Sequence, residues 1–121
     1  MEFHNHTEYK ISVMGSSLGA SFAAWYAWEY PRIHEMLLIN MPIIINWHRV
    51  KKGIAHFGGR VTIIYGDKDP SYKYFGILDA VKSEQVEIGI VTDADHEFSN
   101  CVEQFIELPM RYLLQEPPKS Y

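Results

Sequence analysis

The sequence is poor in cysteine, in clustered positive charge and in long apolar runs. A single cysteine, Cys101, occurs among 121 residues, so no intramolecular disulfide can form and a reducing compartment is indicated. The 11 Lys and Arg residues are outnumbered by 15 Asp and Glu and form no basic stripe for nucleic acid. No apolar run approaches the roughly 20 residues that cross a bilayer, and the first ten residues do not resemble a signal peptide. We therefore expect a soluble, cytoplasmic protein that binds neither nucleic acid nor membranes.

The remaining composition is that of an ordinary folded domain. Hydrophobic residues make up 47% of the chain and charged residues 21%, which is typical of globular rather than disordered proteins. A chain of 121 residues corresponds to one domain by length. We expect a single domain over residues 1–121, with mobile ends at 1–9 and 115–121.

Strand-like and helix-like segments alternate along the chain. Four short apolar runs predict strands over residues 10–14, 35–40, 60–66 and 86–91. Helical patterns lie between and after them, over residues 18–30, 71–84 and 100–115, with an ambiguous short helix within 43–57. This alternation is typical of a parallel sheet covered by helices on both faces. The predicted fold class is therefore α/β, a three-layer sandwich of about four parallel strands.

Local signals define the predicted helix ends. Pro31 stops the first helix, which is apolar nearly all round and is therefore expected to be covered on several sides. Ser71 is a plausible N-cap of the helix over 71–84. Pro109 predicts a bend or an interruption in the last helix.

The first strand is followed by the sequence Gly-Ser-Ser-Leu-Gly, with Ser17 at its centre. A strand, a tight Gly-x-Ser-x-Gly turn and a helix present the serine at a strained backbone angle. Side chains at Gly15 or Gly19 are expected to collide with the neighbouring strand or helix. The N–H of Leu18 opens the helix, so it could bind a developing oxyanion.

Acidic residues follow the third strand, in Tyr-Gly-Asp-Lys-Asp-Pro. In a parallel sheet, functional groups collect beyond the carboxyl ends of the strands, so either Asp67 or Asp69 could reach a base beside Ser17. The alternative is that the Asp-Pro pair only caps a turn or helix.

A histidine, His96, follows the fourth strand in Thr-Asp-Ala-Asp-His-Glu-Phe. It is the one histidine of six on a loop directly after a strong strand. A competing hypothesis, metal binding through His4 and His6, lacks a supporting carboxylate or cysteine cluster. Cys101 has no base near it in sequence and is interpreted as a small buried residue.

The order serine, aspartate, histidine, each after a strand, resembles the α/β-hydrolase fold superfamily. The resemblance runs from residue 10 to about residue 114 and matches the C-terminal half of such a domain. It implies that Ser17 is the nucleophile, His96 the base and Asp69 the orienting acid. Asp69 fits the family's Gly-x-x-Asp pattern, and Asp67 is the alternative.

The resemblance also implies that earlier strands and a second oxyanion donor are missing. The oxyanion hole would then rely on the Leu18 N–H, and the elbow strand would have an open edge that seeks a partner. Two functions follow as expectations. One is an esterase-like or acyl hydrolase without a metal or cofactor, weak or dependent on a partner, acting on a small acyl-ester-like substrate. The other is a non-catalytic, truncated relic that acts as an assembly module.

Two further expectations concern the substrate and the partner. Trp47 would line an apolar acyl pocket, although a plain core role is an equal alternative. The open edge and the aromatic helix after it predict a homodimer through the elbow strand, or a separate chain that supplies the missing half.

Overall fold

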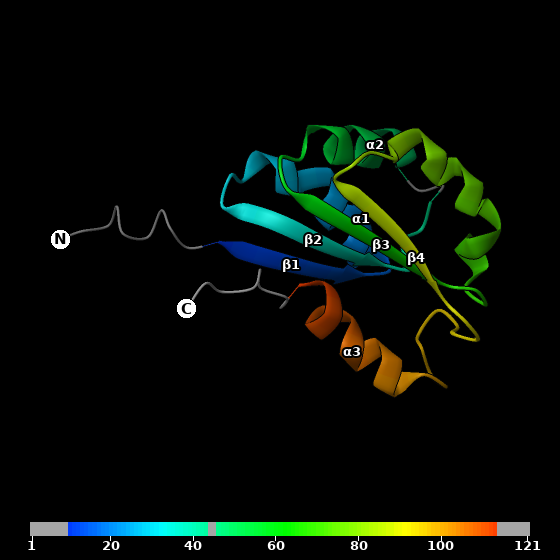
Figure 1. The fold of residues 1–121 in the computed structure, drawn as a ribbon. Coiled ribbons are helices and arrows are strands. Elements are labelled where there is room, and N and C mark those ends of the chain that lie inside the picture. The colour runs from blue at the N-terminus through cyan, green and yellow to red at the C-terminus, as the bar shows by residue number, and fades with distance from the viewer. Residues whose placement is uncertain (1–9, 44–45, 114–121) are drawn as a thin grey trace, which may run out of the picture.

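The computed structural model describes residues 10–43 and 46–113, which form one parallel four-stranded sheet in the order β1-β2-β3-β4 (Figure 1). The strands are β1 (Ile11–Ser16), β2 (Ile33–Ile39), β3 (Arg60–Gly66) and β4 (Val86–Val91). The predicted α/β class and parallel pairing are confirmed. The two ends that were expected to be mobile, together with His4 and His6, lie outside the described residues.

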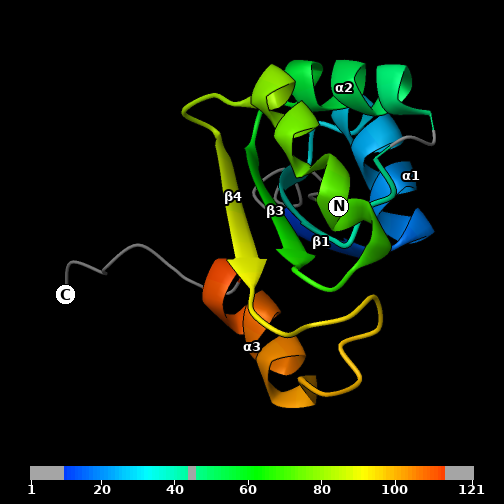
Figure 2. The ribbon, with the colours of Figure 1, turned by 90° about the vertical axis from the view of Figure 1, so that its right-hand side faces the viewer.

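Helices cover both faces of the sheet, as expected (Figures 1 and 2). One face carries α1 (Leu18–Tyr26), the short 3₁₀ helix η2 (Ala27–Glu29), α2 (Trp47–His56) and the 3₁₀ helix η3 (Pro70–Val81). The other face carries α3 (Val102–Tyr112). The result is a three-layer arrangement in which the carboxyl ends of all four strands meet at one edge.

The core forms because the two central strands are apolar on both faces. Met36 and Leu38 belong to the cluster under α1 and α2, whereas Leu37 and Ile39 belong to the cluster under α3. Successive side chains of a strand point to opposite faces, so a strand covered on both sides must be apolar at every position. This explains the continuous run in β2, where residues 36–39 are fully buried.

Several helix ends differ from the expectations. The segment after β3 is a 3₁₀ helix, and its N-cap is Asp69 instead of Ser71, because the Asp69 carboxylate accepts a hydrogen bond from the Ser71 N–H. Helix α3 runs through Pro109 without interruption. The first helix keeps α geometry to Tyr26 and ends as the 3₁₀ turn η2 before Pro31.

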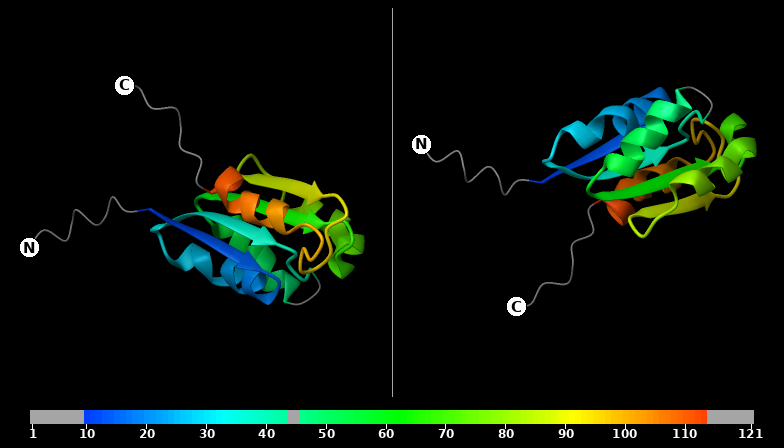
Figure 3. Two further views of the ribbon diagram at one scale, coloured as in Figure 1. Left: turned by 90° about the horizontal axis from the view of Figure 1, so that it is seen from below. Right: turned by 90° about the horizontal axis from the view of Figure 1, so that it is seen from above.

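One side of α1 is open, contrary to the expectation that this apolar helix is covered on several sides. Leu18, Phe22 and Tyr26 are each between 44% and 52% exposed. They belong to a helix that packs on β1, the outermost strand of the sheet among the described residues (Figure 3). None of the described helices is long and apolar enough to cross a membrane.

Candidate active site

Ser17 occupies a strained turn between β1 and α1. Its backbone angles are φ 56° and ψ −128°, a combination that L-residues rarely adopt and that the surrounding structure must enforce. The Ser17 N–H donates to the Ile39 carbonyl at 2.9 Å, which ties the turn to the end of β2. The expected elbow geometry is therefore present.

The two glycines of the motif have different surroundings. A Cβ at Gly15 would lie 2.6 Å from the Gly19 carbonyl oxygen and 2.8 Å from the Ala20 backbone, so the predicted collision holds there. A Cβ at Gly19 would meet nothing within 4 Å, so the predicted collision is wrong at that position. Gly19 lies on the exposed side of α1, whereas Gly15 lies under the helix.

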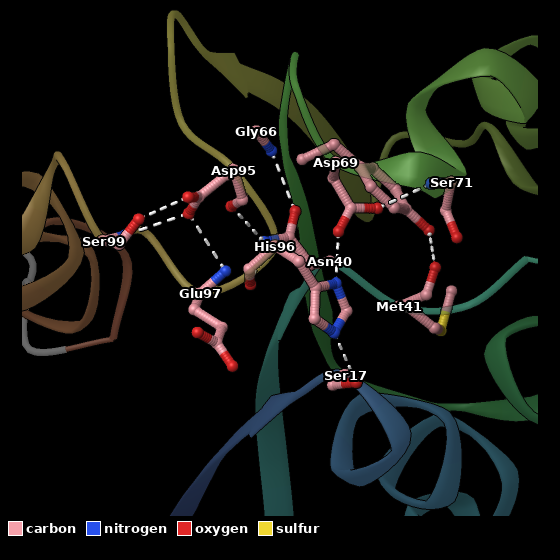
Figure 4. A network of polar contacts seen from close by, with 11 residues as sticks. Ser17, Asn40, Met41, Gly66, Asp69, Ser71, Asp95, His96, Glu97 and Ser99 are labelled. Carbon is pink, nitrogen blue, oxygen red and sulfur yellow. Dashed lines mark hydrogen bonds and ion pairs between the residues drawn. The ribbon is translucent and has the colours of Figure 1, made fainter.

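The structure brings Ser17, His96 and Asp69 together at the carboxyl edge of the sheet (Figure 4). The Ser17 Oγ and the His96 Nε2 are 2.8 Å apart. The other imidazole nitrogen, Nδ1, makes a short contact with the Asp69 Oδ1. With the proton on Nδ1, the imidazole donates to the carboxylate and its Nε2 accepts the serine hydroxyl.

Burial differs sharply along this chain of contacts. The Asp69 side chain is fully buried, whereas 41% of the His96 side chain is exposed. A buried carboxylate must be paired or hydrogen-bonded, and here its two oxygens contact the imidazole and the Ser71 N–H. The imidazole is therefore partly accessible to solvent, whereas the carboxylate that it contacts is not.

Asp67 has a different role from Asp69. Its Oδ1 accepts a hydrogen bond from the Asp93 N–H at 2.8 Å, which links the loop after β3 to the loop after β4. Asp69 is at once the helix cap that the competing hypothesis predicted and the acid beside His96. The two interpretations are compatible, because each uses a different carboxylate oxygen.

Two neighbouring groups have shifted pKa values. Burial, and then the negative charge of Asp69, raise the pKa of the Tyr65 hydroxyl above its usual range. That hydroxyl donates to the Met41 carbonyl at 2.5 Å and stays neutral. Hydrogen bonds from Ser99, chiefly from its hydroxyl and then from its backbone N–H, lower the pKa of the carboxyl of Asp95, the residue before His96 in the sequence.

Other residues singled out in the sequence have structural surroundings. Trp47 begins α2 and packs against the core cluster on that face, and its role in substrate binding stays a prediction. Cys101 is buried, with its thiol 3.7 Å from the Asp93 carbonyl oxygen. Within residues 10–43 and 46–113, no group of three or more His, Cys, Asp or Glu side chains could hold a metal ion.

The sequence analysis missed Asn40, the first residue after β2. It is fully buried, and its carboxamide contacts the backbone at Gly66, Asp95 and His96. Asn40 could have been found from its position in the sequence, because a polar residue directly after a buried parallel strand lies at the edge where functional groups collect.

Comparisons with known proteins find similarity at the level of structure. No protein-family model and no curated protein matches the sequence. An α/β serine hydrolase homologue from Coxiella burnetii matches with a TM-score of 0.69 and 21% identity, over 93% of this chain and 53% of that one.

Two further solved structures give the same result. Est1E from Butyrivibrio proteoclasticus matches with a TM-score of 0.72 and 14% identity, over 87% of this chain and 60% of that one. A dienelactone hydrolase from Anabaena variabilis matches with a TM-score of 0.65 and 20% identity, over 86% of this chain and 50% of that one. The chain therefore spans about half the length of these structures.

Proposed function

We propose that this chain, which has the α/β-hydrolase fold, is a serine hydrolase of carboxylic esters or thioesters. The observation that carries the proposal is the contact chain from Ser17 through His96 to Asp69 at the carboxyl edge of the sheet. A serine that hydrogen-bonds to a histidine oriented by a buried carboxylate is the arrangement of an activated acyl-transfer nucleophile.

Each residue has a definite part in the proposed reaction. The Ser17 Oγ attacks the acyl carbonyl carbon while the His96 Nε2 takes the hydroxyl proton, giving a tetrahedral oxyanion beside the Leu18 N–H. The imidazolium then returns the proton to the leaving alcohol or thiol as the acyl-enzyme forms. Water then attacks the acyl-enzyme carbonyl carbon while His96 takes its proton; the acid leaves, and the imidazolium returns that proton to the Ser17 Oγ. Asp69 holds the imidazole and stabilises its positive charge throughout.

The helix α1 supports the oxyanion step. The first N–H groups of a helix lack intrahelical acceptors and carry partial positive charge, and Leu18 is the first residue of α1. The resemblance places a second donor before the elbow strand. Because losing one donor typically costs about 2.7–4 kcal/mol of transition-state stabilisation, the rate of the proposed reaction depends strongly on a second donor in addition to the Leu18 N–H.

A fluorophosphonate probe tests the assignment of the nucleophile. We expect the wild-type chain to be labelled at Ser17 alone, as mapped by peptide mass spectrometry. Labelling is expected to vanish in Ser17→Ala and to slow by about 10²-fold or more in His96→Ala, because the general base is lost. Ser16→Ala is the matched control, since its side chain lies outside the contact chain. Unchanged labelling of Ser17→Ala would exclude Ser17 as the nucleophile.

The open edge of β1 favours a second function, assembly. The Ile11 N–H donates to the Arg32 carbonyl and the Ser17 N–H donates to the Ile39 carbonyl, so the backbone N–H groups of both residues point toward β2. Backbone groups alternate along a strand, so those of Ser12, Met14 and Ser16 point to the other side, where no described strand pairs with β1. A row of unpaired backbone groups beside exposed apolar side chains is a typical pairing surface.

We propose that a second copy of the chain covers this edge in a two-fold dimer. Joining two four-stranded sheets gives about eight strands, a normal size for α/β proteins. Light scattering after size exclusion at micromolar concentration is expected to give twice the chain mass of 14.1 kDa.

Charge substitutions locate the proposed interface. Phe22 on α1 and Val102 on α3 are similarly exposed, at 52% and 57%. Phe22→Glu is expected to give a folded monomer, because it places a charge in the interface, whereas Val102→Glu is expected to stay dimeric. A wild-type monomer, or a dimer insensitive to Phe22→Glu, would contradict assembly through β1 and α1.

A further inference from the structure

Asn40 joins the ends of three strands through one side chain (Figure 4). It follows β2 directly and is fully buried. Its Oδ1 accepts from the Gly66 N–H at the end of β3 at 2.9 Å. Its Nδ2 donates to the Asp95 carbonyl at 3.2 Å and to the His96 carbonyl at 2.9 Å, both in the loop after β4.

The two donated bonds fix the backbone at His96. The Asp95 carbonyl belongs to the peptide unit before the His96 Cα, and the His96 carbonyl belongs to the unit after it. Holding both units sets φ and ψ at His96 and therefore the direction of its Cα–Cβ bond. This matters because the imidazole is 41% exposed and sits on a loop, where packing alone gives little orientation.

The other two members of the contact chain are tied to the same place. The Ile39 carbonyl, one residue before Asn40, accepts from the Ser17 N–H. Gly66, which donates to Asn40, also accepts from the Asp69 N–H at 3.1 Å. Two consecutive residues at the end of β2, Ile39 and Asn40, therefore bond to the turn that holds Ser17, to the residue just before the loop of Asp69, and to the loop of His96.

The backbone of Asn40 fits this position. Its φ is 50°, in the left-handed region that asparagine adopts more readily than most residues. The Asn40 N–H donates to the Ile64 carbonyl at 2.9 Å, so the residue is held by its main chain as well as by its carboxamide.

We propose that Asn40 is a positioning residue that holds the His96 imidazole between Ser17 and Asp69. The inference rests on the proposed hydrolase function and adds a residue to it. Asn40 touches no reacting atom, and its effect passes through the His96 backbone. Displacing a catalytic group by about 1 Å can lower a rate by about 10²-fold.

Two variants separate the roles of the carboxamide. Asn40→Gly keeps the positive φ and removes all three side-chain bonds. Asn40→Asp keeps an acceptor for the Gly66 N–H but, when ionised, cannot donate to Asp95 or His96. Both variants are expected to slow fluorophosphonate labelling of Ser17 by about 10²-fold. Ile54→Ala, in the core under α2, is the control for a loss of stability without contact to the site.

The NMR signal of the proton on the His96 imidazole reports the orientation of the ring independently of catalytic activity. The proton on the His96 Nδ1, which faces Asp69, is expected to give a far-downfield signal in the wild type and in Ile54→Ala. The signal is expected to weaken or shift in both Asn40 variants. If wild-type Ser17 is not labelled at all, the proposed function fails, and the His96 signal alone decides the role of Asn40.

Two results would overturn the positioning role. The first is wild-type labelling and an unchanged His96 signal in Asn40→Gly. The second result combines two observations. Asn40→Gly and Ile54→Ala, compared at the same fall in unfolding temperature, lose the same amount of labelling, and the His96 signal is retained in Asn40→Gly.

Discussion

Asp69→Asn is expected to lower kcat for ester hydrolysis by about 10⁴-fold, the loss that an asparagine in place of the orienting carboxylate causes in a serine-protease triad. The Asp69 carboxylate is fully buried against the His96 Nδ1. An amide there can donate to Nδ1 and so favour the wrong imidazole tautomer. Initial rates on a p-nitrophenyl ester, with Ser17→Ala as background, measure the effect.

Asp67→Asn is the matched control for this prediction. It removes the same charge two residues away, and its amide oxygen can still accept from the Asp93 N–H. We expect it to retain most of the wild-type rate. The fold should survive in both variants, because the side-chain amide oxygen that Asp69→Asn introduces can still cap η3. The reverse pattern, an inactive Asp67→Asn and an active Asp69→Asn, would move the acid to Asp67.

Gly53→Ala in helix α2 is expected to destabilise the protein more than Gly19→Ala, which changes the one glycine of helix α1. A Cβ at Gly53 would lie 1.9 Å from the Ala24 carbonyl oxygen, a backbone atom of α1. The two helices must move apart, and overpacking of this kind costs about 3 kcal/mol. For a chain of this length that corresponds to a fall in Tm of roughly 10 °C, measurable by thermal unfolding followed by circular dichroism.

Gly76→Ala is the matched control for the helix contact. Gly76 lies within η3, and a Cβ there would meet nothing within 4 Å. Its unfolding free energy is expected to stay within about 1 kcal/mol of the wild type. Equal stability of Gly53→Ala and the wild type would show that α1 and α2 tolerate a wider separation.

The bounds of two strands were predictable from their apolar, β-branched runs, although burial is complete only in β3, where every residue after Arg60 is buried, whereas no residue of β4 is buried. β3 and β4 begin and end where the β-branched runs do, at Arg60–Gly66 and Val86–Val91. The continuous apolar run in β2 also predicted burial on both faces, which the two core clusters confirm. In β2 and β3 local propensity and tertiary packing favour the same structure.

Features that depend on contacts between distant segments were not predictable. Ser71 and Asp69 are both good caps by residue type, and only the position of His96 explains how Asp69 serves two partners. Asn40 belongs to no local sequence motif, because its hydrogen-bond partners, from Gly66 to His96, lie 26 to 56 positions away in the sequence. The exposure of α1 likewise depends on which strand lies outermost in the sheet.

The strand order of the sheet follows the chain order, and this sets when the proposed site is completed during synthesis. Ser17 and His96 are 79 positions apart. At about 5–20 residues per second, the ribosome adds the histidine roughly 4–16 s after the serine. The growing chain can therefore pair β1, β2 and β3 while Ser17 still lacks its base. In the proposed mechanism, Ser17 gains its general base only when β4 and the loop that carries His96 join the sheet.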